Sequence, residues 1–147
     1  MAKYDKIDIL LVEDNPRDAD LTIRALRKNH LANNVFHLED GVQALDYLKC
    51  RGEYANKDNN DNPKVIFLDL KLPKLSGLEV LKQIRSNDNL KNLPVVILTS
   101  SNEDPDIKAA YEIGANSYVV KPVDFKAFQD SLSHLGFYWL LINEVPR

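Results

Sequence analysis

The feature that most constrains the fold of this chain is an alternation, repeated five times, of short apolar runs and segments with helix signals. The apolar runs cover residues 7–12, 34–38, 65–68, 94–98 and 118–120. The helical segments that follow them cover residues 15–29, 41–48, 77–86, 104–113 and a stretch from about 123 to beyond 135. Strands that alternate with helices predict a parallel sheet with helices on both faces. The sequence therefore predicts a three-layer α/β fold with five βα units.

Local signals place the ends and inward faces of these helices. Asn15 and Asp104 each precede a proline, which indicates a capping residue followed by proline in the first turn, and Gly114 is a glycine of the type that ends helices. Residues 51–63 are rich in Asn and Asp and indicate a long surface loop. In the first two helices, the apolar residues expected to face the core are Leu21, Ala25, Leu26, Val42, Leu45 and Leu48.

The run at residues 65–68 is followed at once by a carboxylate, Asp69. Four apolar residues in a row indicate a strand buried on both faces, as in a parallel sheet. An ionised carboxylate inside such a strand would cost several kcal/mol, so Asp69 is expected just past the carboxyl end of the strand. Open α/β sheets bind ligands at that edge. Taken alone, Asp69 is better explained as a turn residue that caps the segment after it.

Composition limits the classes of protein that this chain can belong to. A chain of 147 residues with 44% hydrophobic content fits one domain, residues 1–147. The net charge of −3 and the lack of a basic block argue against a large nucleic-acid surface. No signal peptide is recognised, and no apolar stretch is long enough to span a membrane. The single cysteine, Cys50, excludes an intrachain disulfide and indicates a reducing, cytoplasmic location.

Four of the five predicted strands end in a polar or charged side chain. These residues are Glu13 with Asp14, Asp69, Thr99 and Lys121. In a parallel sheet with the flavodoxin-like order 2-1-3-4-5 these ends share one edge, and strands one and three are neighbours. The gathered carboxylates would repel one another unless a cation joins them, and Mg²⁺ prefers one or two carboxylates with water and a phosphate oxygen. Each residue alone has a simpler explanation, but together they predict phosphoryl transfer to a carboxylate.

These residues make the chain resemble a response-regulator receiver domain of two-component signalling, over a core of about residues 5–135. The matching motifs are Leu-Val-Glu-Asp-Asn at 11–15, Leu-Asp-Leu-Lys-Leu-Pro at 68–73, Gly77, Leu-Thr-Ser at 98–100 and Lys-Pro at 121–122. The resemblance implies that Asp69 accepts a phosphoryl group from a sensor histidine kinase. It also implies that the domain is not an enzyme with a separate substrate but catalyses only its own phosphorylation and dephosphorylation.

The resemblance also implies roles for the residues around Asp69. The expected Mg²⁺ ligands are Glu13, Asp14, Asp69 and the backbone carbonyl of Lys71. Lys121 would bind the phosphoryl group, and its bond to Pro122 is expected to be cis. Thr99 and Tyr118 match a switch pair in which the hydroxyl moves towards the phosphoryl group and the ring turns inwards, although a half-exposed strand tyrosine would look the same in sequence.

A narrower resemblance concerns the partner. Gly-Glu-Tyr at 52–54 and the aromatic residues at 137–140 resemble single-domain regulators that partner cyanobacterial and bacterial phytochromes, whereas Pro122 and Asp124 follow the general receiver pattern. A bacterial phytochrome is therefore one candidate for the kinase. No output domain is expected after residue 135, so the signal would leave through contacts with a target protein or through onward phosphotransfer.

Three other functions use part of the same residue set. A haloacid-dehalogenase-like phosphatase needs a second Asp two residues after the nucleophile, where this chain has Lys71. A flavodoxin-like flavin carrier needs a Ser-, Thr- and Gly-rich loop after strand one, where this chain has acids. An adaptor that never takes phosphate would have little use for all four groups.

The final predicted helix carries more apolar surface than one domain can bury. Its apolar stripe continues into the extension at residues 136–147, where six consecutive residues, 137–142, are apolar or aromatic. Dimerisation through this helix would cover the surplus, and two-fold pairing is the commonest oligomer geometry. The alternative is that the tail bends at Gly136 and folds back on its own domain. The stripe consists of Phe125, Phe128, Leu132, Leu135, Trp139 and Ile142.

Overall fold

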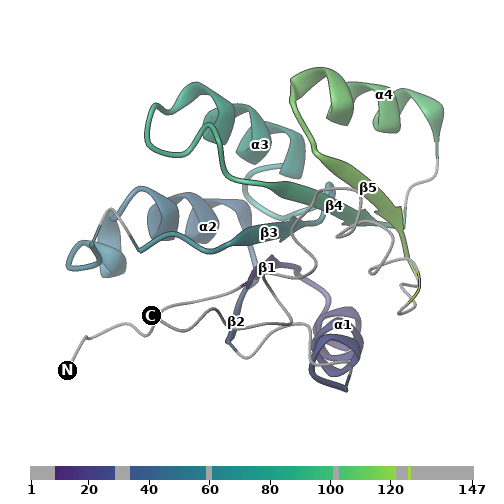
Figure 1. Cartoon of the computed structure of the whole chain (residues 1–147), viewed down its shortest axis with the longest axis horizontal. Helices are drawn as coiled ribbons and strands as arrows, with labels where there is room; N and C mark the ends of the chain where they lie inside the picture. The colour runs from purple at the N-terminus through teal and green to yellow at the C-terminus, as the bar shows by residue number, and fades with distance from the viewer. Residues whose placement is uncertain (1–8, 29–33, 59–60, 101–102, 122–125, 127–147) are drawn as a thin grey trace.

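A computed structural model describes residues 9–28, 34–58, 61–100, 103–121 and 126 of the chain (Figure 1). Strands and helices alternate along these residues, as the sequence predicts. The strands are β1 (Ile9–Val12), β2 (Val35–Leu38), β3 (Val65–Leu68), β4 (Val95–Thr99) and β5 (Ser117–Val120). The helices are α1 (Pro16–Lys28), α2 (Gly41–Leu48), α3 (Gly77–Ser86) and α4 (Asp104–Ile113), with a short 3₁₀ turn, η1 (Gly52–Tyr54).

The five strands form one parallel sheet in the order β2-β1-β3-β4-β5, which confirms the predicted flavodoxin-like order. The register aligns the carboxyl ends: Val12 at the end of β1 lies beside Leu38 of β2 and Leu68 of β3. On the other side, Thr99 at the end of β4 lies beside Val120 of β5. The residues that follow these strand ends are therefore brought to one edge of the sheet.

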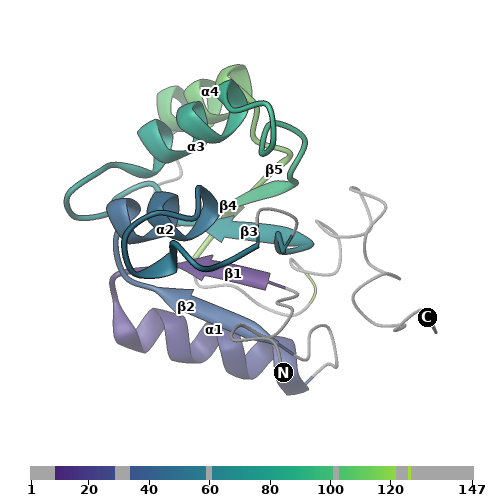
Figure 2. The same ribbon diagram turned by 90° about the vertical axis from the view of Figure 1, so that its left-hand side faces the viewer.

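The sheet is the middle layer of the molecule. Helix α1 lies against one face, and α2, α3 and α4 lie against the other (Figure 2). Strands β1, β3 and β4 are buried along their whole length, as expected for strands covered on both faces. No helix in the described ranges combines the length and the apolar character needed to cross a bilayer.

Two of the predicted inward-facing residues point to solvent instead. Leu21 of α1 is 55% exposed and Val42 of α2 is 41% exposed. Among the residues of α1 whose burial the structure describes, Ala19, Thr22 and Leu26 are buried, and they lie three and four residues apart on one face. The prediction for Leu21 was wrong because Thr22, a polar residue, occupies the buried position next to it. Leu26 was predicted correctly, as were Leu45 and Leu48.

The described residues of the segment predicted to be a surface loop, 51–58 and 61–63, include a short helical turn and buried side chains. The turn is η1, and Tyr54 is buried with its ring edge against Tyr47, at 5.2 Å between ring centroids. Phe36 packs against both rings, and the ammonium of the buried Lys57 lies 4.7 Å from the centre of the Tyr47 ring. An Asn- and Asp-rich composition indicates a loop, but it does not show that one aromatic residue of the segment, Tyr54, is buried.

The helix ends show which of the predicted helix caps are present in the structure. The Asn15 side chain accepts hydrogen bonds from the backbone N–H groups of Arg17 and Asp18, at 2.9 and 3.1 Å, which confirms the predicted cap of α1. The cap of α4 was placed one residue too late, because Glu103 precedes the helix and Asp104 is its first residue. Gly114 ends α4 with a φ of 126°, a backbone angle that favours glycine.

A guanidinium ties the amino-terminal ends of β4 and β5 to α3. Arg85 of α3 donates from Nε to the carbonyl of Gly114 at 2.9 Å and from Nη1 to the carbonyl of Leu93 at 2.7 Å. It also donates to the carbonyl of Lys91 at 3.0 Å and to Oδ1 of Asn116 at 2.8 Å. Burial lowers the pKa of the Arg85 guanidinium. Every one of these acceptors is a neutral oxygen.

Several predictions for the last part of the chain lie outside the described residues. They are the cis Lys121–Pro122 bond, the final helix from about residue 123, and the apolar stripe proposed to form a dimer.

Candidate functional site

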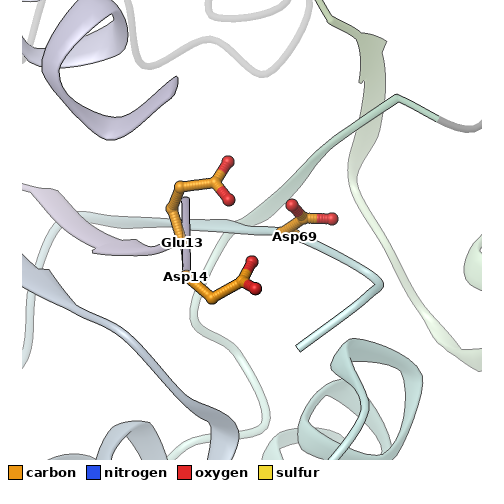
Figure 3. A group of neighbouring side chains, drawn as sticks. All are labelled: Glu13, Asp14 and Asp69. Carbon is orange, nitrogen blue, oxygen red and sulfur yellow. The ribbon is translucent and has the colours of Figure 1, made fainter. Parts of the chain in front are cut away.

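The side chains predicted to form the site meet at the carboxyl edge of the sheet. Glu13 and Asp14 follow β1, Asp69 follows β3, Thr99 ends β4, and Lys121 follows β5. Figure 3 shows Glu13 and Asp14 extending from the end of β1 on the side where Asp69 lies. One carboxylate oxygen from each of these three acids lies within 4.8 Å of the others. The predicted cluster of acids is therefore present in the structure.

Lys121 is the centre of the charge network. Its Nζ atom contacts three carboxylates: Glu13 Oε1 at 2.5 Å, Asp18 Oδ2 at 2.9 Å and Asp69 Oδ2 at 3.0 Å. An ammonium has three N–H donors, so these contacts use all of them. Burial alone would lower the pKa of Lys121, but the hydrogen bonds to the three carboxylates raise it above its ordinary value. Lys121 is therefore held in its charged form.

Asp18 is the member of this network that the sequence reasoning missed. It lies in the first turn of α1, five residues after Glu13, and its side chain is 36% exposed. An acidic residue in the first turn of a helix is common because it interacts favourably with the helix dipole, so the residue alone gave no sign of a site. Glu13 and Asp14 precede the helix, which begins at Pro16, so no helical spacing in the sequence links them to Asp18.

Asp69 is held rigidly, with its residue only 6% exposed. Its backbone N–H donates to the carbonyl of Val12 at 3.1 Å, and its Oδ1 atom accepts the backbone N–H of Lys71 at 3.1 Å. Gly77, at the start of α3, packs directly on this segment, and a Cβ atom there would lie 2.0 Å from the Asp69 carbonyl oxygen. A side chain at position 77 would therefore displace the Asp69 backbone.

Glu13 is the most buried acid of the site, at 3% exposed. Its Oε2 atom accepts the backbone N–H of Asn15 at 3.2 Å, and its carbonyl oxygen lies 2.7 Å from Nε2 of His37 in β2. Burial, together with the nearby charge of Asp69, raises the pKa of Glu13 to about 7, although the hydrogen bond from Lys121 opposes the shift. Loss of the Glu13 proton near neutral pH adds a negative charge to the site.

The site has more negative than positive charge. Glu13, Asp18 and Asp69 contact one ammonium, and Asp14 adds an exposed carboxylate beside them. A divalent cation would relieve this imbalance, and hard carboxylate oxygens at one edge are the ligands that Mg²⁺ prefers. The residues therefore fit the predicted metal. The backbone carbonyl of Lys71 stays a prediction as a further ligand.

The two predicted switch residues lie on neighbouring strands. Thr99 is fully buried, and its carbonyl oxygen accepts the backbone N–H of Lys121 at 2.8 Å, which fixes the end of β5 to the end of β4. Tyr118 is partly buried and packs against the core, opposite Ile97 in the sheet register. Thr99 thus lies at the edge where the acids meet, Tyr118 lies two residues before the end of the neighbouring strand, and their coupled movement on phosphorylation stays a prediction.

Comparison with known proteins matches most of the chain to the model of one protein family. A family model described as "Response regulator receiver domain" matches residues 9–133. The response regulator Rcp1 of Synechocystis sp. (strain ATCC 27184 / PCC 6803 / Kazusa) is 38% identical over 138 residues, which cover 94% of this chain and 92% of Rcp1. A structure described as the Mn(2+)-bound form of Rcp1 aligns with a TM-score of 0.75 at 36% identity, over 96% of this chain and 99% of Rcp1.

Two further solved structures are similar along almost the whole chain. The bacteriophytochrome response regulator AtBRR is 51% identical and aligns with a TM-score of 0.83, over 96% of this chain and 100% of AtBRR. A structure described as the phosphorylated cyanobacterial phytochrome response regulator RcpA is 35% identical, with a TM-score of 0.74 over 97% of this chain and 98% of RcpA.

Proposed function

Because the chain belongs to the response-regulator receiver domain family, we propose that Asp69 accepts a phosphoryl group from a sensor histidine kinase and that this modification switches a protein-interaction surface. The observation that carries the proposal is the position of Asp69, which lies between the Lys121 ammonium at 3.0 Å and the acid pair that follows β1. A carboxylate held beside a cation and a candidate metal site is the arrangement that a phosphoryl acceptor needs.

In the proposed reaction, an Asp69 carboxylate oxygen forms a bond to phosphorus while the bond between phosphorus and the kinase histidine nitrogen breaks. The electrons of the broken bond leave with the histidine, which takes up a proton. Mg²⁺, held by Glu13, Asp14, Asp69 and the Lys71 carbonyl, would neutralise charge on the transferred group. Lys121 would bind a phosphoryl oxygen and Thr99 would donate a hydrogen bond to another.

The proposed output is a change of surface rather than a reaction on a separate substrate. Thr99 would follow the phosphoryl group, and the Tyr118 ring would move into the space that opens behind it. The buried position of Thr99 and the partial burial of Tyr118 support this coupling. We propose that residues 1–147 act as a single receiver domain whose signal passes to a target protein or a phosphotransfer protein.

The partners follow from the relatives and from the sequence. The 51% identity to a bacteriophytochrome response regulator supports a bacterial phytochrome as the kinase. A cytoplasmic location is proposed for this protein, because its phosphoryl group would come from such a kinase. A homodimer formed through the apolar stripe of residues 125–142 is proposed from the sequence alone, since these residues lie outside the described ranges.

The proposal is tested by incubating the protein with Mg²⁺ and a small phosphodonor and measuring its intact mass. The wild-type protein is expected to gain one phosphoryl group, and Asp69→Asn is expected to gain none while keeping its fold. Asp88→Asn serves as a matched control because Asp88 is almost fully exposed and forms only a surface ion pair with Lys91. Stoichiometric uptake by Asp69→Asn would show that the acceptor lies elsewhere, and no uptake by the wild type would refute the proposed function.

A further inference from the structure

The Lys121 ammonium has no donor left for an additional anion. Its three contacts are with Glu13, Asp18 and Asp69, and its side chain is only 11% exposed. If Lys121 is to bind an oxygen of a phosphoryl group on Asp69, it must give up or share at least one of these contacts. Which contact is given up then determines how favourably the site binds the phosphoryl group.

The three carboxylates differ in how easily they can lose the ammonium. The side chains of Glu13 and Asp69 are 4% and 8% exposed, so losing their cation would leave buried charges without a partner. The Asp18 side chain is 36% exposed, and water can solvate its carboxylate once Lys121 has moved away. The contact with Asp18 is therefore the one that costs least to break.

The backbone of Asp18 is held in place at the start of α1. Its backbone N–H donates to Oδ1 of Asn15 at 3.1 Å, and it lies in the first turn of α1, which the buried side chains of Ala19 and Leu26 anchor. When the ammonium shifts towards the end of β3, the Asp18 carboxylate can therefore move only as far as its short side chain allows. A charge held in this position attracts Lys121 away from Asp69 and repels an anion that binds there.

We propose that Asp18 is a positioning residue that competes with the phosphoryl group for the Lys121 ammonium and so weakens the affinity of the site for phosphoryl-like anions. The inference rests on the proposed function of Asp69 and deepens it. Removing the Asp18 charge should free one donor of Lys121 and lower the repulsion of the anion. Both effects favour the phosphoryl-bound state, whereas loss of a nearby negative charge cannot favour a metal cation.

The chain offers a matched control on the same helix. Asp20 also lies in α1, but its side chain is 57% exposed and it pairs with Arg24 at 3.0 Å, one turn further along the helix. Asp18→Asn and Asp20→Asn change the net charge equally and keep the side-chain shape. Asp18→Ser is a second variant in case the amide forms a new contact with Lys121, because serine is also accepted near helix starts.

The experiment measures the binding of beryllium fluoride, a stable analogue of a phosphoryl group on a carboxylate, by fluorine NMR with Mg²⁺ at saturation. Asp18→Asn and Asp18→Ser are expected to lower its apparent Kd about fivefold, the size of one partly exposed charge pair, and Asp20→Asn to change it less than about twofold. Mg²⁺ affinity without beryllium fluoride, measured by calorimetry, is expected to stay the same or weaken. Tighter binding of beryllium fluoride without tighter binding of Mg²⁺ separates competition for Lys121 from a general loss of structure, which would weaken the binding of both ligands.

Three results would overturn the inference. If both Asp18 variants bind beryllium fluoride no more tightly than Asp20→Asn, the contact between Asp18 and Lys121 does not oppose the anion. If they bind it more weakly, Asp18 instead holds Lys121 in its productive position. If the wild-type protein with Mg²⁺ does not bind beryllium fluoride at all, the proposed function fails, and this inference fails with it.

Discussion

Two partly buried cations lie at opposite ends of the same sheet, and their hydrogen-bond partners differ in charge. Arg85, near the amino-terminal ends of β4 and β5, donates to three backbone carbonyls and one side-chain amide oxygen. Lys121, at the carboxyl ends, contacts three carboxylates. Both cations have several partners, but only Lys121 has partners whose total charge exceeds its own.

This difference separates a structural cluster from a functional one. The oxygens around Arg85 are neutral and already belong to the turns they hold together, so the cluster gains nothing from a further ligand. Around Lys121 the surplus of negative charge is unfavourable, and a bound cation would relieve it. Local conflicts of this kind are expected at functional sites and are compensated elsewhere in the fold. Three substitutions or titrations test the contrast.

The largest effect on stability is expected from Arg85→Met. The change removes four hydrogen bonds and leaves the carbonyls of Gly114 and Leu93 without this donor, so the free energy of unfolding should fall by about 3 kcal/mol. Urea unfolding followed by circular dichroism measures the loss. Arg24→Met, which removes an exposed arginine, is the control and should change stability by less than about 0.5 kcal/mol. The folded fraction of Arg85→Met should still take up phosphate, and a variant as stable as the wild type would contradict a structural role.

An intermediate effect is expected from pH, through Glu13. The pKa of Glu13 is raised in the folded protein from 4.5 to about 7, so the folded state binds the proton more tightly than the unfolded state between these values. Without metal, the part of the free energy of unfolding that Glu13 contributes is therefore fully present below about pH 4.5 and is lost as the pH rises to about 7.

The measurement compares urea unfolding of the wild type and of Glu13→Gln across this range in the presence of a chelator. The difference between the two proteins should change with pH between about 4.5 and 7 and stay constant above it. A difference that does not vary with pH would show that Glu13 is already ionised in the folded protein at acidic pH.

The smallest effect is expected from Asp14→Asn. Asp14 is exposed and adds to the surplus of negative charge, so its neutralisation should raise the free energy of unfolding without metal by about 0.5 kcal/mol. The same change should remove most of the stabilisation that saturating Mg²⁺ gives the wild type, because binding to the folded state is lost. Thermal melts with Mg²⁺ and with a chelator measure both effects. An undiminished Mg²⁺ response in Asp14→Asn would place the metal elsewhere.

The parts predicted correctly from sequence depend on the order of residues along the chain. Apolar runs that end in Asp69 or in Glu13 and Asp14 place these acids at strand ends, and a parallel sheet brings such ends together whatever the details of packing. The acid cluster was predicted by combining this geometry with the flavodoxin-like strand order, in which strands one and three are neighbours. Lys121 was placed at the same edge by the same reasoning, and the structure confirms its contact with Asp69.

The parts that were missed depend on contacts that have no sequence pattern. Asp18 looks like an ordinary acid of a first helical turn, and only the fold brings Lys121 to it. Arg85 binds mostly backbone carbonyls, which every residue possesses, so no motif marks its partners. The burial of Tyr54 within a polar segment and the exposure of Leu21 likewise depend on packing between elements.

The sequence separation of the site residues has a consequence for the synthesis of this protein. Lys121 and Glu13 are 108 positions apart, and Lys121 and Asp69 are 52 apart. Bringing such distant residues together has a large loop-closure entropy cost, so these contacts are expected to form late in folding. A nascent chain that has just exposed Asp69 has its acids but not the ammonium that joins them. The complete charge network around Asp69 should therefore form only when β5 joins the sheet.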